Sequence, residues 1–186
     1  MPGSGAVRSI WPAVPGIMPG EAFGSWFGRI AARYGLDVLA LARAADLGLD
    51  LGAHARAWIA AHPPMGSGAR MLSALTGIAA EEIERMGADA GPGRATHAYA
   101  YCFGCLVLNP WDVAAPYWQR RWLQGGWSGC DEHPAEYDEL RPSHLQTHRN
   151  MSRLLKLAGQ RHAARVRRRR SNCDEMRVVS TVRGHH

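Results

Sequence analysis

Three cysteines and one histidine near the middle of the chain have the spacing of a metal site. Cys102 and Cys105 form a C-x2-C pair, and Cys130 and His133 form a C-x2-H pair after 24 intervening residues. In structural sites Zn²⁺ takes four such ligands in a tetrahedron, and each pair can direct both side chains at one ion from a tight turn. Gly104 suits the crowded backbone of such a turn. The spacing predicts one structural Zn²⁺ per chain, in a zinc-ribbon-like module with Cys3His ligands.

Two other kinds of chemistry share parts of this pattern. A redox C-x-x-C pair normally opens a helix after a strand in a βαβ unit, and the surrounding sequence has no such pattern. A metal-dependent nuclease needs an open metal position and nearby carboxylates, whereas four protein ligands close the site. Acidic residues flank the second pair and leave the nuclease open as an alternative. They are Asp131, Glu132, Glu136, Asp138 and Glu139.

A block of positive charge is the second feature with chemical consequences. Residues 1–140 hold 10 Arg against 14 acidic residues, whereas residues 141–170 hold 10 Lys and Arg together and no acidic residue. Such a block commonly meets a polyanion, although a solvated tail that only aids solubility has the same composition. We expect contacts with DNA phosphates from its arginine-rich part. These residues are Arg161, Arg165, Arg167, Arg168, Arg169 and Arg170.

The elements that must position these residues are mostly helices. Alanine and other helix formers dominate residues 21–90, and Phe23, Trp26, Phe27 and Ile30 recur at helical spacing as one apolar stripe. We therefore predict a mainly α protein in which Trp26 belongs to the core. The zinc segment has few strong apolar residues beyond five aromatic ones, so we expect the metal to replace a core that it lacks. These five are Trp111, Tyr117, Trp118, Trp122 and Trp127.

Composition divides the chain into five segments. They are a flexible N-terminus at 1–18, a small helical domain at 19–97, a zinc-binding module at 98–142, a basic amphipathic helix at 143–170 and a disordered tail at 171–186. No signal peptide and no apolar run of membrane-spanning length is visible, and clustered Cys and His suggest a reducing compartment. We therefore expect a cytoplasmic protein without a membrane partner.

A helical hairpin lies within the helical domain. Met71, Leu72 and Leu75 form a short apolar face, a turn follows at Thr76 and Gly77, and residues 79–86 form a second short helix. Two short helices around a glycine-containing turn are typical of a DNA-binding helix-turn-helix. The same pattern is also typical of two helices that only pack together, so the sequence leaves both interpretations open.

The residues of these segments resemble the TniQ family over about residues 18–140. The family's opening matches Pro19, Glu21, Ser25, Trp26 and Arg29, and "LSALTGIAAEEIERM" is similar to its helix-turn-helix region. The family's zinc segment matches the following residues here: Tyr101, Cys102, Cys105, Trp122, Cys130 and His133. Family members are commonly longer, often with a second zinc module, and often carry a further Cys after the C-x2-H pair. The sequence therefore resembles either a short variant of the family or a truncated remnant.

The resemblance implies a non-catalytic accessory protein of bacterial transposons. Such proteins link target selection to the transposition machinery, contact an AAA+ ATPase and sometimes a CRISPR effector complex. The leading hypothesis is therefore a nucleoid-associated transposition adaptor that binds DNA and other transposon proteins, with a homodimer left open. A small zinc-containing transcription regulator that uses the hairpin is the alternative, followed by the metal-dependent nuclease.

Overall fold

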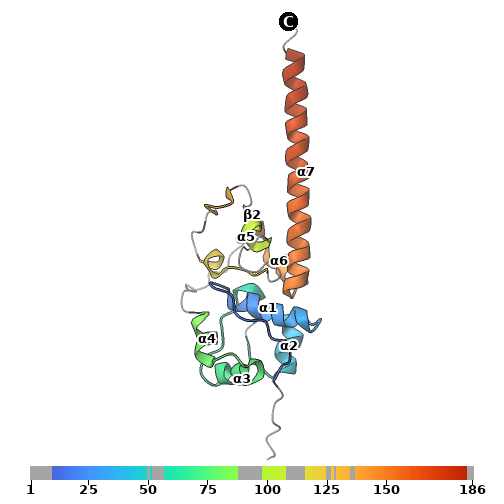
Figure 1. The fold of residues 1–186 in the computed structure, drawn as a ribbon. Helices are drawn as coiled ribbons and strands as arrows, with labels where there is room; N and C mark the ends of the chain where they lie inside the picture. The colour runs from blue at the N-terminus through green and yellow to red at the C-terminus, as the bar shows by residue number, and fades with distance from the viewer. Residues whose placement is uncertain are drawn as a thin grey trace, which may run out of the picture.

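Helix α1 (Phe23–Arg33) is the centre of the computed structural model, which describes residues 10–49, 51, 57–87, 98–107, 116–124, 127, 129–134 and 137–183. The remaining elements are α2 (Val38–Ala44), η1 (Trp58–Ala60), α3 (Ser67–Thr76), α4 (Ala80–Arg85), β1 (Tyr99–Cys102), α5 (Phe103–Val107), η2 (Arg120–Leu123), β2 (Tyr137–Leu140), α6 (Pro142–Thr147) and α7 (Met151–Arg183). Figure 1 shows these elements in one body from which α7 projects. The protein is mainly α, as predicted.

The predicted apolar stripe of α1 lies in the core. Phe23, Trp26, Phe27 and Ile30 are at most 2% exposed, and Gly35 ends this region with a φ of 66°. Such a positive φ is accessible to glycine without strain, so the chain can turn sharply into α2.

Two glycines on α1 allow η1 to pack closely against it. A Cβ on Gly24 would lie 2.1 Å from the carbonyl oxygen of Trp58, and a Cβ on Gly28 would lie 2.5 Å from the Trp58 ring. The indole N–H of Trp58 in turn donates to the carbonyl oxygens of Leu145 (2.9 Å) and His148 (3.0 Å). Trp58 therefore joins α1 to the chain segment that leads into α7.

The basic region forms two helices where one was predicted over residues 143–170. Asn150 separates α6 from α7: its side-chain oxygen accepts from the backbone N–H of Arg153 (3.0 Å), and its amide donates to the carbonyl of Leu36 (2.8 Å). The carbonyl of Arg149 also accepts from the backbone N–H of Val38 (2.8 Å). This buried asparagine caps α7 and fixes the break, because its side chain satisfies a backbone donor at the start of the helix.

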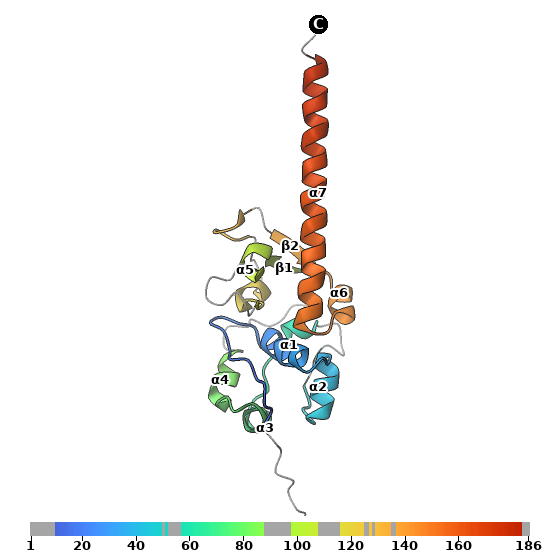
Figure 2. The same ribbon diagram turned by 45° about the vertical axis from the view of Figure 1, so that its right-hand side comes forward.

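Helix α7 continues beyond the predicted end at residue 170. Its 33 residues reach Arg183, so most of the predicted disordered tail at 171–186 is helical, and residues 184–186 lie outside the described residues. At 1.5 Å per residue the helix is about 50 Å long. Figure 2 shows that only its lower part lies against the body and that its C-terminal part extends away from it. Within the described chain, no helix combines the length and apolar character needed to cross a membrane.

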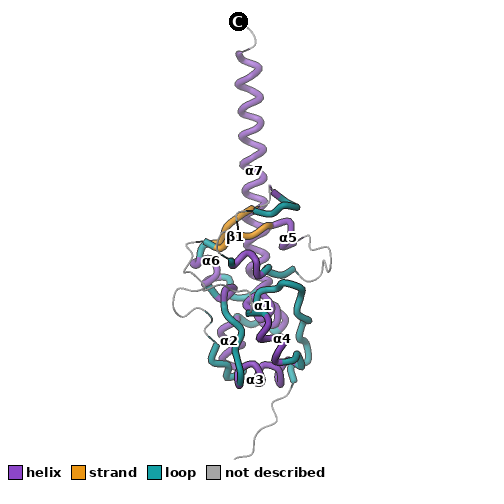
Figure 3. Tube along the Cα trace, turned by 90° about the vertical axis from the view of Figure 1, so that its left-hand side faces the viewer, coloured by secondary structure: helices purple, strands orange, loops and turns teal. Residues whose placement is uncertain are grey.

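One continuous core joins the predicted helical domain to the predicted zinc module. A single cluster of buried side chains contains Trp26 and Ile59 together with Tyr101, Trp118 and Leu140. Strands β1 and β2 pair antiparallel, from Tyr99 opposite Leu140 to Cys102 opposite Tyr137, and Figure 3 shows this two-stranded sheet beside α5 and above α1. The predicted division at residues 97 and 98 therefore does not separate two cores, although the linker 88–97 itself lies outside the described residues.

The described part of the predicted flexible N-terminus packs on the body. The backbone N–H of Trp11 donates to the carbonyl of Leu75 (2.6 Å), and that of Ala13 donates to the Tyr34 hydroxyl (3.1 Å). The Trp26 indole donates to the carbonyl of Pro15 (2.8 Å). Residues 10–18 are thus held against α1 and α3, and residues 1–9 lie outside the described residues.

Candidate metal centre

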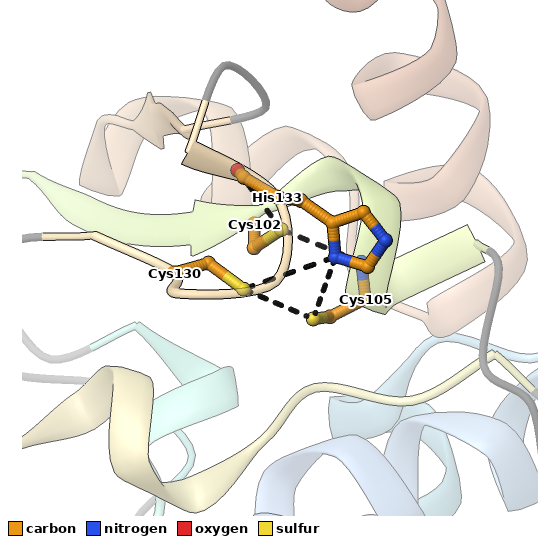
Figure 4. Close-up of side chains that lie close together, drawn as sticks. All are labelled: Cys102, Cys105, Cys130 and His133. Carbon is orange, nitrogen blue, oxygen red and sulfur yellow. Dashed lines mark hydrogen bonds between the residues drawn. The ribbon is translucent and has the colours of Figure 1, made fainter.

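The four predicted ligands come together between the β1–α5 turn and the loop that precedes β2. Cys102 ends β1, Cys105 lies in α5, and Cys130 and His133 lie in the loop. Their Sγ and imidazole nitrogen atoms all lie within 4.8 Å of one another. Figure 4 shows the four side chains directed toward a common centre.

The distances within this cluster fit a tetrahedral metal ion. Cys105 Sγ lies 3.4 Å from Cys130 Sγ and 3.4 Å from His133 Nδ1, and Cys130 Sγ lies 3.8 Å from the same nitrogen. Typical Zn–S and Zn–N bond lengths in a tetrahedron place two sulfurs about 3.8 Å apart and a sulfur and a nitrogen about 3.6 Å apart. Among the described residues, no other group of His, Cys, Asp and Glu side chains has this proximity.

Gly104 makes room for the histidine ligand. A Cβ at this position would lie 2.7 Å from both Cγ and Cδ2 of His133 and 3.1 Å from Nδ1. The sequence suggested crowding within the turn itself, but the neighbour is the imidazole ring of the second pair. The backbone N–H of Cys105 also points at Cys102 Sγ (3.4 Å), a contact that favours a thiolate. The turn therefore contacts the Cys102 sulfur through the backbone N–H of Cys105 and contacts the His133 imidazole ring at Gly104.

The environment of the thiols differs among the three cysteines. Burial raises the pKa of the Cys102 and Cys105 thiols. Burial also acts to raise the pKa of Cys130, but hydrogen bonds with His133 and Cys105 outweigh it and lower this pKa to about 7. Zinc binds thiolates, so its binding releases protons and its affinity increases with pH.

The candidate metal centre adjoins an aromatic core, contrary to the expectation that a metal replaces a missing core. Tyr101, Trp118 and Trp122 are at most 3% exposed. The rings of Tyr101 and Trp118 have centroids 5.2 Å apart, and those of Trp118 and Trp122 are 5.3 Å apart. Because these rings are continuous with the packing of α1, the region has apolar burial of its own and a metal would add to it.

The motif residues near the N-terminus form a buried polar network. Glu21 is 1% exposed, and its carboxylate accepts from the Ser25 hydroxyl (2.8 Å) and pairs with Arg29 (2.8 Å). The Ser25 oxygen accepts from the backbone N–H of Trp118 (2.8 Å). Burial raises the pKa of Glu21 to about 7, against the lowering effects of Arg29, the Met18 backbone N–H and Ser25. This network joins α1 to the segment that carries the aromatic core.

The other motif residues contact the same junction. The carbonyl of Pro19 accepts from the Tyr117 hydroxyl (3.1 Å), and Glu21 and Gln119 form an isolated antiparallel bridge. Trp26 holds the N-terminal segment through Pro15, and Trp122 packs edge-on against Trp118. The motif residues that are not candidate metal ligands thus contribute to packing at one junction; they are Pro19, Glu21, Ser25, Trp26, Arg29 and Trp122.

The six predicted DNA-contacting arginines fall into two groups. Arg161 pairs with Asp138 (3.4 Å), and Arg165 donates to the carbonyl of Tyr137 and contacts His162. These two side chains are therefore engaged with β2 and with their own helix. The other four lie beyond this contact and are exposed; they are Arg167, Arg168, Arg169 and Arg170.

The helical hairpin forms as predicted, with an acidic second helix. Gly77 has a φ of 73° between α3 and α4, as a tight turn requires. Helix α4 has only six residues, and three of them are Glu81, Glu82 and Glu84. Negative side chains repel phosphates, so this helix is poorly suited electrostatically to enter a DNA groove.

Two contacts of the site were missed by the sequence reasoning. The rings of Phe103 and His162 stack with centroids 3.9 Å apart, and Asp138 is the partner of Arg161. Each contact joins residues separated by more than twenty positions, and no local spacing indicates either one. These residues come together only because α7 packs against α5 and β2.

Comparison with known proteins places the chain in a family. No curated protein and no solved structure gives a match. A family model described as TniQ matches residues 12–136, about two thirds of the 186 residues. The matched region contains the polar network, the helical hairpin and all four candidate ligands. The chain belongs to the TniQ family.

Proposed function

We propose that the protein is a non-catalytic accessory factor of transposition that binds DNA through the exposed arginines of α7. Membership of the TniQ family supports a transposition-associated accessory role. The finer assignment combines this role with the metal centre and with the basic surface described above. We further propose a cytoplasmic, nucleoid-associated location for such a factor.

The Cys3His centre has the proposed role of a structural zinc site. Cys102 and Cys105 would hold the ion from the end of β1 and from α5, and Cys130 and His133 would hold it from the loop before β2. When bound, zinc supplies four bonds that join these two segments, and with four protein ligands it has no position for an activated water. Among the described acidic residues beside the centre none enters the ligand cluster: Asp138 pairs with Arg161, Asp131, Glu132 and Glu139 are exposed, and Glu136 lies outside the described residues. This arrangement favours the structural role over the nuclease alternative.

The single observation that carries the DNA proposal is the position of Arg167 to Arg170. These four consecutive arginines are exposed on the part of α7 that extends away from the body. Consecutive positions on a helix lie about 100° apart, so the four guanidinium groups surround the helix and do not form one stripe. Such a charge distribution suits phosphates on both sides of a groove and carries no information about base sequence. Target choice would therefore come from a partner.

The proposed partners are an AAA+ transposition ATPase or another transposon protein, with a CRISPR effector complex or a second copy of the chain as further candidates. Family membership supports a transposon-protein partner in general. The alternative of a transcription regulator would use α3 and α4, but the acidic face of α4 disfavours it. A palindromic footprint on DNA would support the regulator.

The salt dependence of duplex binding tests the DNA proposal. The log–log slope of affinity against salt should be about 0.9 per neutralised phosphate. Replacing Arg167, Arg168, Arg169 and Arg170 with alanine should lower this slope by roughly three to four. The variant should lose affinity equally for all duplex sequences, because phosphate contacts are common to them.

A matched control removes the same charge elsewhere. Arg33, Arg43, Arg70 and Arg85 are exposed on the helical body, and their replacement with alanine should change the slope much less. Equal slopes for the two quadruple variants, or an affinity that does not depend on salt, would contradict the assignment to α7. Cleavage of DNA with Mg²⁺ or Mn²⁺ that is lost on mutation of Asp131 or Glu132 would favour the nuclease.

A further inference from the structure

Helix α7 is held at two levels along its length. At its base Met151, Leu154 and Ala158 are at most 2% exposed, and α7 contacts α1 there. We refer to these three residues as the basal contact. One turn farther along α7, three residues contact α5 and β2, and we refer to them as the distal contact. They are Arg161, His162 and Arg165. Beyond the distal contact the helix extends away from the body (Figure 1).

The distal contact engages residues that lie beside the metal ligands. The His162 ring stacks on Phe103 with centroids 3.9 Å apart and an angle of 6° between the planes. Phe103 lies between Cys102 and Cys105 in the sequence, within the turn that supplies two ligands. The position of this aromatic ring therefore depends on the conformation of the metal-binding turn.

The remaining partners lie on β2. Arg161 pairs with Asp138 (3.4 Å), and Arg165 donates to the carbonyl of Tyr137. Tyr137 lies directly opposite Cys102 in the β1–β2 register, and β2 begins four residues after His133. The distal contact is therefore linked to both ligand pairs: Phe103 lies between Cys102 and Cys105, and Tyr137 and Asp138 follow His133 in β2.

A glycine separates the two levels. Gly159 lies between Ala158 of the basal contact and Arg161 of the distal contact. A Cβ at Gly159 would meet nothing within 4 Å, so packing does not require a glycine there. Glycine weakens a helix relative to alanine. The helix is therefore easiest to bend between its two contacts.

We propose that metal binding at the Cys3His centre sets the direction of α7, and with it the position of the exposed arginines relative to the body. The bound ion holds the turn and β2, and these two segments hold the distal contact. Without the ion the basal contact alone retains α7, which then bends at Gly159. This inference rests on the metal binding of the proposed function but does not require DNA binding.

Hydrogen–deuterium exchange of the full chain tests the proposal in the absence of DNA. We expect residues 160–166 to exchange about tenfold faster after zinc is removed with a chelator, which is the size expected from losing one aromatic pair and one partly exposed ion pair. Residues 151–157 should keep most of their protection, and added Zn²⁺ should restore the slower exchange at 160–166. Gly159→Ala, which causes no clash, should lessen the effect of zinc removal.

Two variants separate the distal contact from metal binding itself. Phe103→Ala and Asp138→Asn leave all four ligands in place, so both proteins should retain one zinc per chain while residues 160–166 exchange faster. Glu139→Gln is the matched control, because Glu139 lies next to Asp138 on β2 but is exposed and accepts from the Tyr137 hydroxyl. It should exchange like the unaltered protein.

The outcomes are distinguishable from a failure of the proposed function. Zinc-bound protein whose exchange at 160–166 is unchanged by chelation and by Phe103→Ala would overturn this inference and leave the structural zinc site intact. Protein that binds no zinc would overturn both. Loss of duplex affinity on mutating Arg167 to Arg170 bears only on DNA binding. If chelation unfolds the chain throughout, the zinc-loaded Phe103 and Asp138 variants decide the question.

Discussion

Replacing Gly104 with alanine tests how tightly the metal centre is built. The added methyl would lie 2.7 Å from two ring carbons of His133, whereas carbon atoms in contact prefer about 3.5 to 4.0 Å. The imidazole or the turn must therefore move by about 1 Å, although ligand distances at such sites are defined within about 0.2 Å. We expect zinc affinity to fall by about tenfold to a hundredfold, the range typical of changes to groups behind metal ligands. This corresponds to about 1.4 to 2.7 kcal/mol.

Gly129→Ala is the matched control for this prediction. Gly129 immediately precedes Cys130, has no positive φ, and a Cβ there would meet nothing within 4 Å. Competition with a coloured chelator gives the zinc affinity of each variant, and Co²⁺ substitution reports the ligand set through its visible spectrum. Equal affinities for Gly104→Ala and Gly129→Ala would refute the close packing of His133 on the turn, because only the methyl at Gly104 meets the His133 ring.

Three further predictions concern the metal, the core and the buried carboxylate. Purified protein should contain one Zn²⁺ per chain, and Cys102→Ser with Cys130→Ser should abolish it in metal analysis; full zinc in this variant would exclude the ligand set. Trp26→Ala should lower the free energy of unfolding by roughly 3 to 5 kcal/mol, because Trp26 is 0% exposed. Ile10→Ala, at a residue 62% exposed, should change it by less than about 0.5 kcal/mol, and an unchanged thermal midpoint for Trp26→Ala would contradict the burial. Burial raises the pKa of Glu21 from 4.5 to about 7, so its contribution to stability is complete below about pH 4.5 and is lost as the pH rises through about 7. In urea unfolding the stability of the native protein relative to Glu21→Gln should therefore fall by about 3 kcal/mol over this interval, and parallel pH profiles would count against the raised pKa.

The clustering of the four candidate ligands and the first helix could be predicted because their signals are local. Two residues within one turn can reach the same ion whatever surrounds them, so C-x2-C and C-x2-H are informative without a fold. The stripe of α1 is similarly a property of helical spacing. The break at Asn150 also had a local signal, since asparagine before an apolar helical pattern is typical of an N-cap. Reading residues 143–170 as one helix overlooked this signal.

The different environments of the six arginines could not be read from the sequence. Arg161 and Arg165 belong to the same basic block as Arg167 to Arg170, and all six have the same chemistry. Their environments differ because β2 contacts α7 only as far along the helix as Arg165. How far this contact extends depends on the register of β1 and β2 and on the loop that precedes β2. The partners Tyr137 and Asp138 precede these arginines by more than twenty residues. Contacts at such separation are set by the tertiary fold, which the charge pattern does not describe.

The polar network around Glu21 explains why the helical and metal-binding regions share one core. A buried carboxylate is costly unless its oxygens accept hydrogen bonds or pair with a charge, and here Ser25, Arg29 and the Met18 backbone N–H supply these partners. Ser25 has a second role, because its oxygen accepts from the Trp118 backbone N–H, which would otherwise be a buried donor without a partner in this network. One hydroxyl therefore satisfies groups from both regions. Separating the two regions would leave the Trp118 backbone N–H without its acceptor and the Ser25 oxygen without this donor. This loss would add to the free-energy cost of exposing Trp26 and Trp118.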